Sequence, residues 1–202
     1  MIVIVDYGVG NVASVLNMLR KVGAKARVSG SAADVAASDK LILPGIGHFG
    51  HGMRKLAESG LVPSLREQAL VQRKPILGIC LGMQMMTRGS EESGVAGLGW
   101  LDAFTRRFSE SPGRRVPHMG WNSVRPAAGA RLFDHQAPEP ERFYFVHSYF
   151  VQMADPADTA AICRYGDEFT AAFEHDNLFG VQFHPEKSHL FGMNVLRRFA
   201  SA

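Results

Sequence analysis

The cysteine at position 80 lies between two glycines, in the run Gly78-Ile79-Cys80-Leu81-Gly82. This G-x-C-x-G spacing is the thiol counterpart of the G-x-S-x-G nucleophile elbow, a sharp turn from a strand into a helix. Such a turn leaves no room for Cβ atoms beside the nucleophile, which explains both glycines. A thiol at a helix start also lies near unpaired N–H groups that favour the thiolate. Cys80 is therefore a candidate nucleophile; a buried structural cysteine is the alternative.

Among eight histidines, His184 is the best candidate for the base that a thiol nucleophile needs. It follows the apolar run 178–183, and Glu186 comes two residues later, with the rigid Pro185 between them. A carboxylate in this place can hold the imidazole Nδ1–H and leave Nε2 facing the thiol. The sequence therefore predicts a triad of Cys80, His184 and Glu186.

A second glycine-containing loop, Gly45-Ile46-Gly47-His48, follows the apolar run 41–43. Glycines on both sides of Ile46 allow its peptide to point an N–H at a ligand, so the loop is a candidate oxyanion donor. An ordinary glycine turn explains the same residues equally well. The H-x-x-H spacing of His48 and His51 lacks a third ligand, and no metal is expected.

The loop Gly8-Val9-Gly10-Asn11-Val12-Ala13 matches the dinucleotide fingerprint G-x-G-x-x-A. The acidic residue that should end the next strand is missing, because Ser29 and Gly30 stand there. A nicotinamide-dependent oxidoreductase is therefore a minor alternative, and no cofactor is expected.

The elements that position these residues alternate between strands and helices. Apolar runs at 1–5 and 41–43 are typical of strands covered on both faces, a further strand is expected near 26–28, and residues 12–22 have the spacing of a helix with one apolar face. We therefore expect an α/β fold with a doubly wound, mostly parallel sheet flanked by helices. Function belongs at the carboxyl ends of its strands.

The second half of the chain predicts added antiparallel strands. Residues 94–128 indicate loops and short edge strands, with Trp121 in an exposed turn. One aromatic strand is expected over 142–151 and a hairpin over 168–183 that turns at 175–177. Ser188 is expected to cap a closing helix whose apolar face consists of Leu190, Phe191, Val195, Leu196 and Phe199.

Length and composition limit the class of protein. A chain of 202 residues with 46% hydrophobic and 20% charged residues is typical of one globular domain, spanning 1–202. We expect a cytoplasmic protein, because it shows neither a membrane-length apolar run nor a secretory leader, and its two cysteines make no disulfide framework. The net charge of +3 comes partly from scattered pairs, so nucleic-acid binding is not expected; the pairs are Arg106-Arg107, Arg114-Arg115 and Arg197-Arg198.

Both catalytic motifs resemble the signatures of class I (triad) glutamine amidotransferases: Gly78-Ile79-Cys80-Leu81-Gly82-Met83-Gln84 and Phe183-His184-Pro185-Glu186. Four further stretches extend the resemblance over nearly the whole chain, to the glutaminase subunits of imidazole-glycerol-phosphate synthases. They are Asp6 to Asn11, Leu43 to Gly47, Pro117 to Asn122 and Tyr144 to Tyr149.

The resemblance implies roles for particular residues. Cys80 would attack the side-chain amide of L-glutamine, with His184 and Glu186 as base and orienting carboxylate. Oxyanion donors would come from Leu81 and from Ile46 and Gly47. Residues implied to hold glutamine are Gly47, Gln84, Tyr144, Ser148 and Tyr149.

The resemblance also implies a partner. Ammonia would pass to a cyclase subunit with a (β/α)₈ barrel, in a heterodimer whose contact lies near Asn11, Trp121 and Lys187. Two alternatives remain within the fold: a subunit of another triad amidotransferase, serving anthranilate, guanylate or pyridoxal phosphate synthesis, and a catalytically idle subunit.

Overall fold

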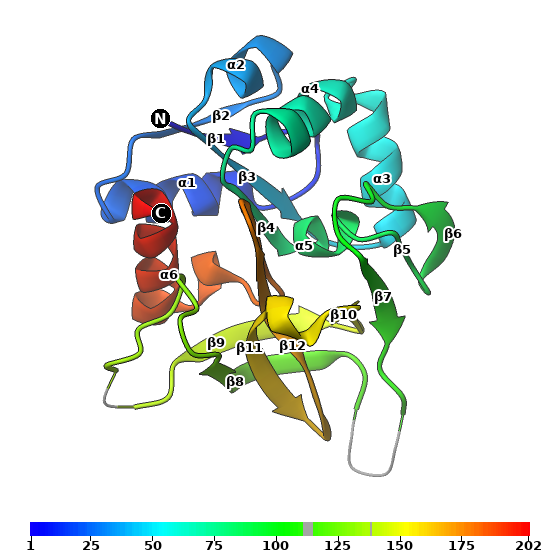
Figure 1. The fold of residues 1–202 in the computed structure, drawn as a ribbon, viewed down its shortest axis with the longest axis vertical. Helices are drawn as coiled ribbons and strands as arrows, with labels where there is room; N and C mark the ends of the chain where they lie inside the picture. Colours follow the sequence, from blue (N-terminus) through cyan, green and yellow to red (C-terminus); the bar gives the residue numbers. More distant parts are fainter. Residues whose placement is uncertain (111–114, 138) are drawn as a thin grey trace.

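The structure is a computed structural model that describes residues 1–110, 115–137 and 139–202. Parallel strands form one half of its sheet (Figure 1). Their order across the sheet is β2 (Ala26–Ser29), β1 (Ile2–Val5), β3 (Lys40–Gly45), β4 (Ile76–Cys80) and β13 (Leu178–Val181). Because β1, β3 and β4 are interior strands, both of their faces are buried, as their continuous apolar runs predict.

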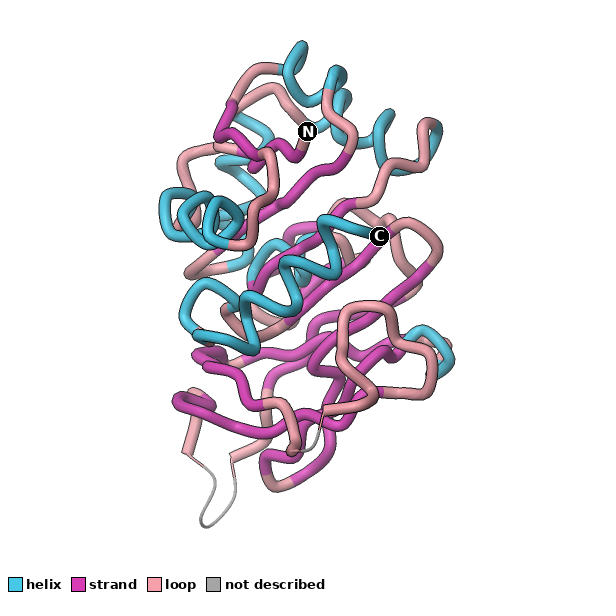
Figure 2. Tube along the Cα trace, turned by 90° about the vertical axis from the view of Figure 1, so that its left-hand side faces the viewer, coloured by secondary structure: helices cyan, strands magenta, loops and turns pink. Residues whose placement is uncertain are grey.

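Helices cover the parallel strands on two faces (Figures 1 and 2). Ile2 and Ile4 pack with α1 and α6, whereas Val3 and Val5 point to the opposite core with α2 to α5. Successive side chains of a strand point to opposite faces of the sheet, so β1 contributes to both apolar layers. The helices are α1 (Val12–Lys21), α2 (Ala32–Ala37), α3 (Phe49–Glu58), α4 (Val62–Arg66), α5 (Leu81–Met85) and α6 (His189–Ser201).

Antiparallel strands extend the sheet beyond β13. They follow in the order β12 (Asp167–His175), β10 (Tyr149–Met153), β7 (Ala103–Arg107), β5 (Gly89–Ser90) and β6 (Ser93–Ala96). A branch runs from β12 through β11 (Thr159–Tyr165) and β8 (His118–Pro126) to β9 (Arg142–His147). Short helical turns lie at Glu67–Val71, Pro156–Asp158 and Pro185–Lys187. The expected α/β class is confirmed: a parallel sheet flanked by helices, with added antiparallel strands, forms one mixed sheet.

The expected strand over 142–151 is wrong in one respect, because the structure breaks it at Ser148. Strand β9 pairs with β8, and β10 turns away to pair with β7 and β12. Aromatic residues run through both strands, so strand propensity alone gives no sign of the break. The break has a functional consequence, since it places Ser148 at the edge of a cavity.

Trp121 lies in β8 and not in a turn. Its side chain remains 41% exposed because the strand's other face carries the buried contacts.

The N-terminus of α6 also differs from the expectation. Ser188 Oγ makes no capping bond; it donates to the main-chain oxygen of His184 at 2.6 Å and accepts from Tyr144 N–H at 3.0 Å. Leu190, expected on the apolar face, is 62% exposed.

The glycine loop after β1 has a structural explanation. Gly8 and Gly10 have φ values of +83° and +114°, and a Cβ on Gly10 would lie 3.2 Å from Pro44 Cβ. The glycines therefore let this loop turn tightly against the end of β3.

Several charged side chains on the surface form ion pairs. Arg106, Arg107 and Arg198 form ion pairs with Glu91, Glu110 and Asp134; Arg114 of the remaining pair lies outside the described residues. Within the described ranges, no helix has both the length and the apolar character to cross a membrane.

Candidate active site

Cys80 ends β4 in the conformation expected of a nucleophile elbow. Its φ of +53° and ψ of −108° are unusual for a residue with a side chain, and α5 begins at the next residue. A Cβ on Gly78 would lie 2.6 Å from Met83 N, and one on Gly82 would overlap the main-chain oxygen of Leu43. The steric role of the two glycines is therefore confirmed. Helix α5 has only five residues, so its dipole is small.

Replacing Gly82 by alanine is expected to destabilise the protein by about 3 kcal/mol, because the added methyl group overlaps a backbone atom that cannot rotate away. The matched control is Gly94→Ala, where a Cβ meets nothing within 4 Å. Urea unfolding of both variants checks the prediction. Equal unfolding midpoints for the two would show that the elbow yields easily.

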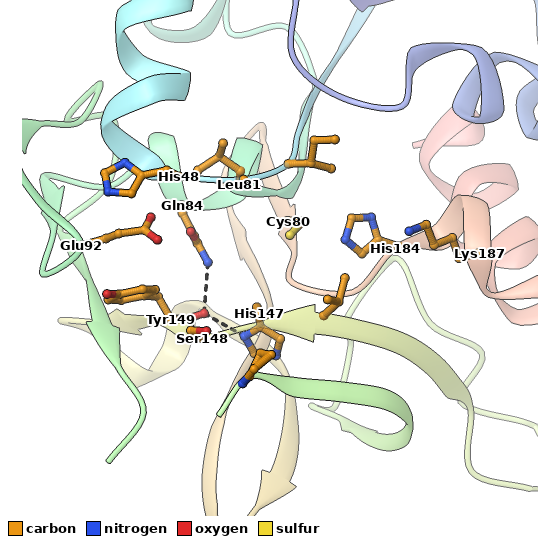
Figure 3. Close-up of a pocket in the computed structure, with 14 residues that line it drawn as sticks. His48, Cys80, Leu81, Gln84, Glu92, His147, Ser148, Tyr149, His184 and Lys187 are labelled. Carbon is orange, nitrogen blue, oxygen red and sulfur yellow. Dashed lines mark hydrogen bonds between the residues drawn. The ribbon is translucent and has the colours of Figure 1, made fainter. Parts of the chain in front are cut away.

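His184 is held in the orientation that a base for Cys80 requires. Its Nδ1 lies 2.9 Å from Glu186 Oε1, and both side chains are 2% exposed. Its main-chain N–H donates to the oxygen of Tyr144 at 2.9 Å, which fixes the segment against β9. The other ring nitrogen, Nε2, is buried without a hydrogen-bond partner among the described residues, and Figure 3 shows the imidazole beside the Cys80 sulfur.

The charges around His184 favour its protonated form. Burial by itself lowers the pKa of His184, but interactions with Cys80 and Glu186 outweigh it and raise the pKa to about 10. A thiolate and an imidazolium held together in this way are the reactive state of a cysteine nucleophile.

A cavity of about 510 Å³ opens over Cys80 (Figure 3). It brings together most of the predicted site residues from four separate stretches of chain. Its predicted members are Ile46, Gly47, Cys80, Leu81, Gln84, Ser148, Tyr149, His184 and Lys187. Glu186 lies behind His184. The other lining residues are His48, Glu92, Pro117, Val146 and His147.

Besides Glu186, three predicted residues lie outside the lining of this cavity: Tyr144, Trp121 and Asn11. The Tyr144 ring instead packs against Trp121, at 6.3 Å between centroids, and below the Lys187 ammonium, at 5.6 Å. Trp121 also stacks on His189 at 5.5 Å. Asn11 precedes α1 and is partly exposed. The structure thus places Tyr144 with an exposed aromatic cluster, not with the cavity.

Two residues that the sequence analysis did not single out contact the nucleophile or line the cavity. Gln182 is fully buried; its amide Nε2 donates to Cys80 Sγ at 3.7 Å, and its Oε1 accepts from Gln84 Nε2 at 3.0 Å. Glu92 lines the cavity while its Oε2 accepts from Phe49 N–H at 2.6 Å. The sequence did indicate Gln182, because a single amide stands in the apolar run 178–183. Glu92 stands among other polar residues, so nothing in the sequence indicated its role.

Tyr7 braces the strand end opposite the elbow. Its hydroxyl donates to the oxygen of Pro44 at 2.7 Å, and burial together with the nearby Cys80 charge raises its pKa above the ordinary value. A Cβ on Gly45 would lie 2.8 Å from Gly82 N and 2.9 Å from the Tyr7 hydroxyl. The end of β3 is therefore packed directly on the elbow.

Residues 3–201 match the family described as Glutamine amidotransferase class-I. The chain belongs to this family. Within it, the chain is 53% identical over 199 residues to imidazole glycerol phosphate synthase subunit HisH 2 of Pseudomonas aeruginosa, covering 98% of each chain. It is 45% identical to the subunit HisH 2 of Methanococcus maripaludis, again over 98% of each chain. These identities group it with the HisH subunits of imidazole glycerol phosphate synthase.

Solved structures share the fold at lower identity. A glutamine amidotransferase superposes with a TM-score of 0.76 at 17% identity, over 100% of this chain and 99% of that one. PurLQS from Thermotoga maritima superposes with a TM-score of 0.71 at 20% identity, over 99% of this chain and 96% of that one.

Proposed function

We propose that residues 1–202 act as one glutaminase domain that hydrolyses L-glutamine and supplies ammonia to a cyclase subunit. The observation that carries this proposal is the buried Cys80, in a strained backbone conformation, beside an imidazole that Glu186 orients at 2.9 Å. The cavity of about 510 Å³ above the sulfur has room for an amino acid.

In the first half of the reaction, the Cys80 thiolate attacks the side-chain carbonyl carbon of glutamine. A tetrahedral intermediate forms, and the His184 imidazolium gives its Nε2 proton to the departing nitrogen. Ammonia leaves, and a glutamyl thioester remains on Cys80. Gln182 Nε2, which donates to the sulfur at 3.7 Å, stabilises the thiolate before the attack.

In the second half, His184 takes a proton from water, which attacks the thioester carbonyl. The second tetrahedral intermediate collapses to glutamate and the Cys80 thiolate, and the His184 imidazolium is restored. Glu186 accepts the hydrogen bond from Nδ1 throughout and keeps that proton in place.

The oxyanion of both intermediates is proposed to bind the N–H of Leu81 and an N–H from Ile46 or Gly47. Ile46 is 47% exposed and Gly47 has a φ of +85°, so the loop that follows β3 has few packing restraints, unlike Gly45 at the end of the strand. A carboxylate in the same cavity, Glu92, suits the α-ammonium group of glutamine, and Ser148 and Tyr149 line the space nearby. These groups would favour a free amino acid over a simple amide.

The partner is proposed to be the (β/α)₈-barrel cyclase of imidazole glycerol phosphate synthase, in a heterodimer that acts in histidine biosynthesis. Its products would be imidazole glycerol phosphate and an aminoimidazole carboxamide ribotide. Exposed apolar side chains support a contact around Trp121, 41% exposed, and Met119, 63% exposed. Asn11 and Lys187 are the polar residues proposed for the same contact.

The test is glutamate release by the chain alone, with the cyclase, and with the cyclase and its nucleotide substrate. We expect slow hydrolysis by the chain alone and an increase of about 10²–10³-fold in the full assembly, the usual effect of one oxyanion donor. Equal turnover in all three samples would refute control by the Ile46 peptide. No glutamate in any sample would refute the glutaminase.

A further inference from the structure

Two buried imidazoles form a pair beside the cavity. His118 on β8 is 3% exposed and His147 on β9 is 7% exposed, and they face each other across the strand pair. The distance from His118 Nδ1 to His147 Nε2 is 3.0 Å. His147 lines the cavity, whereas His118 lies behind it, against Phe145 and Tyr165 at ring-centroid distances of 4.8 and 4.1 Å.

The partners of the pair determine where each proton lies. His147 Nδ1 is 2.7 Å from the Tyr149 carbonyl, which only accepts, so Nδ1 carries the proton. In a neutral ring Nε2 is then an acceptor, and His118 Nδ1 must donate to it. His118 Nε2 in turn accepts from Asn122 Nδ2 at 3.3 Å.

The Asn122 amide is itself fixed. Its Oδ1 accepts from Ser123 N–H at 2.8 Å, and its Nδ2 donates to the Arg164 oxygen at 2.9 Å. The three side chains therefore have one consistent hydrogen-bond direction, from Asn122 through both imidazoles to Tyr149.

Both rings are held neutral by their surroundings. Burial lowers the pKa of His118 to about 4. For His147, burial is again the main cause, and the nearby charges of His118 and His184 add to it, so that its pKa falls to about 3 despite the bond to Tyr149. A neutral pair does not oppose the positive charge that His184 carries during catalysis.

The Tyr149 carbonyl joins this pair to the nucleophile. It also accepts from Gln84 Nε2 at 3.0 Å, and both bonds are drawn in Figure 3. Gln84 Nε2 donates its second hydrogen to Gln182, the residue that contacts Cys80 Sγ. With both amide hydrogens used, Gln84 keeps its Oε1 as an acceptor at the cavity.

We propose that His118 is a positioning residue for glutamine hydrolysis: through His147 it holds the Tyr149 carbonyl, and with it Gln84, at the substrate cavity. The inference rests on the glutaminase function proposed above. His118 touches no substrate, and its effect is the orientation of groups that do. Small displacements of such groups lower the rate or affinity strongly.

The test compares two substitutions in the heterodimer. His118→Phe keeps a ring between Phe145 and Tyr165 but removes the donor to His147. We expect kcat/KM for glutamine to fall about tenfold, mainly through a higher KM, with ammonium-dependent product formation unchanged. His118→Asn places an N–H close to the position of Nδ1 and is expected to restore part of the loss. His51→Phe, on the exposed face of α3, is the control and should match wild type.

Long-range ¹H–¹⁵N spectra of the imidazoles supply a readout that a packing defect would not move. We expect His147 to carry its proton on Nδ1, with no titration between about pH 5 and 8, in wild type. In His118→Phe the Tyr149 carbonyl still holds the proton on Nδ1, but Nε2 loses its donor, so the ¹⁵N shift of Nε2 should move toward that of a nitrogen that accepts no hydrogen bond. If that variant does not fold, His118→Asn and the wild-type spectra decide the matter.

The inference is overturned by an unchanged kcat/KM in His118→Phe, by a loss that asparagine does not reduce, or by an Nε2–H tautomer of His147. Failure of the proposed function gives a different result. Wild type and His51→Phe would then release no glutamate, while the imidazole spectra would still report the hydrogen-bond direction.

Discussion

Replacing Cys80 by alanine is expected to remove glutamine-dependent product formation, by about 10⁶-fold, while the complex continues to use added ammonium salt. The methyl group cannot form a thioester, and Cys80 is the one thiol among the described residues that line the cavity. In the proposed complex this subunit supplies the cyclase with ammonia alone, so adding ammonium salt directly bypasses the missing step. Product formation with glutamine and with ammonium, measured on the same sample, checks the prediction.

Cys163→Ala is the matched control, because it removes the second buried thiol. Cys163 is 2% exposed in β11, and burial raises its pKa to about 12, which keeps the thiol protonated and unreactive. We expect full glutamine use and a modest loss of stability from the small cavity left behind. If Cys80→Ala retained glutamine use, or if Cys163→Ala lost it, Cys80 could not be the nucleophile.

Local patterns in the sequence predicted the parts of the site that depend on neighbouring residues. The glycines around Cys80 imply a tight turn, and the structure shows overlap wherever a Cβ is added there. The carboxylate two residues after His184 lies at hydrogen-bond distance from its ring. The turn at 175–177 also forms as expected, with Asp176 at a φ of +53°. In each case the constraint lies within a few residues of chain.

Features that depend on distant strand pairing could not be predicted in the same way. Ser148 interrupts an aromatic run because β9 and β10 pair with different neighbours, and nothing in the run itself requires the break. The residues around Trp121 are typical of a turn, but the pairing of β8 with β9 and β11 makes Trp121 part of a strand. The sequence marks such residues as unusual but does not say which residues they meet.

Buried polar residues show the same limit. Gln182, directly after β13, and His118, at the start of β8, each have apolar neighbours, which indicates that each has a partner. The identity of that partner is a matter of tertiary structure: Gln182 meets Cys80 from 102 positions away, and His118 meets His147 from 29. Tyr144 illustrates the opposite case, since its motif suggested the substrate and its ring lies against Trp121 and Lys187.

Replacing Glu186 by glutamine is expected to lower kcat for glutamine by about 10³–10⁴-fold, with the fold intact. The amide can donate to His184 Nδ1 and so stabilise the tautomer that carries its proton on Nε2, which leaves no base facing Cys80. The carboxylate also raises the pKa of His184. Losing the carboxylate lowers the pKa of His184. The alkaline limb of the pH profile, where the imidazolium loses its proton, therefore moves to lower pH. The pH profile of kcat/KM measures both effects.

The chain offers a matched histidine–carboxylate pair away from the site. His175 Nδ1 lies 2.9 Å from Asp158 Oδ1, the same distance as in the catalytic pair, but the histidine side chain is 45% exposed. Solvent screens that pair, so Asp158→Asn should change neither the rate nor the pH profile. The two pairs share the donor, the acceptor class and the distance, and differ in burial and in contact with Cys80, so the comparison tests whether a histidine–carboxylate bond matters only where it orients the base. An equal, small effect of both substitutions would mean that Glu186 does not orient His184, and that the imidazole is held by its packing and by the main-chain bond to Tyr144 alone.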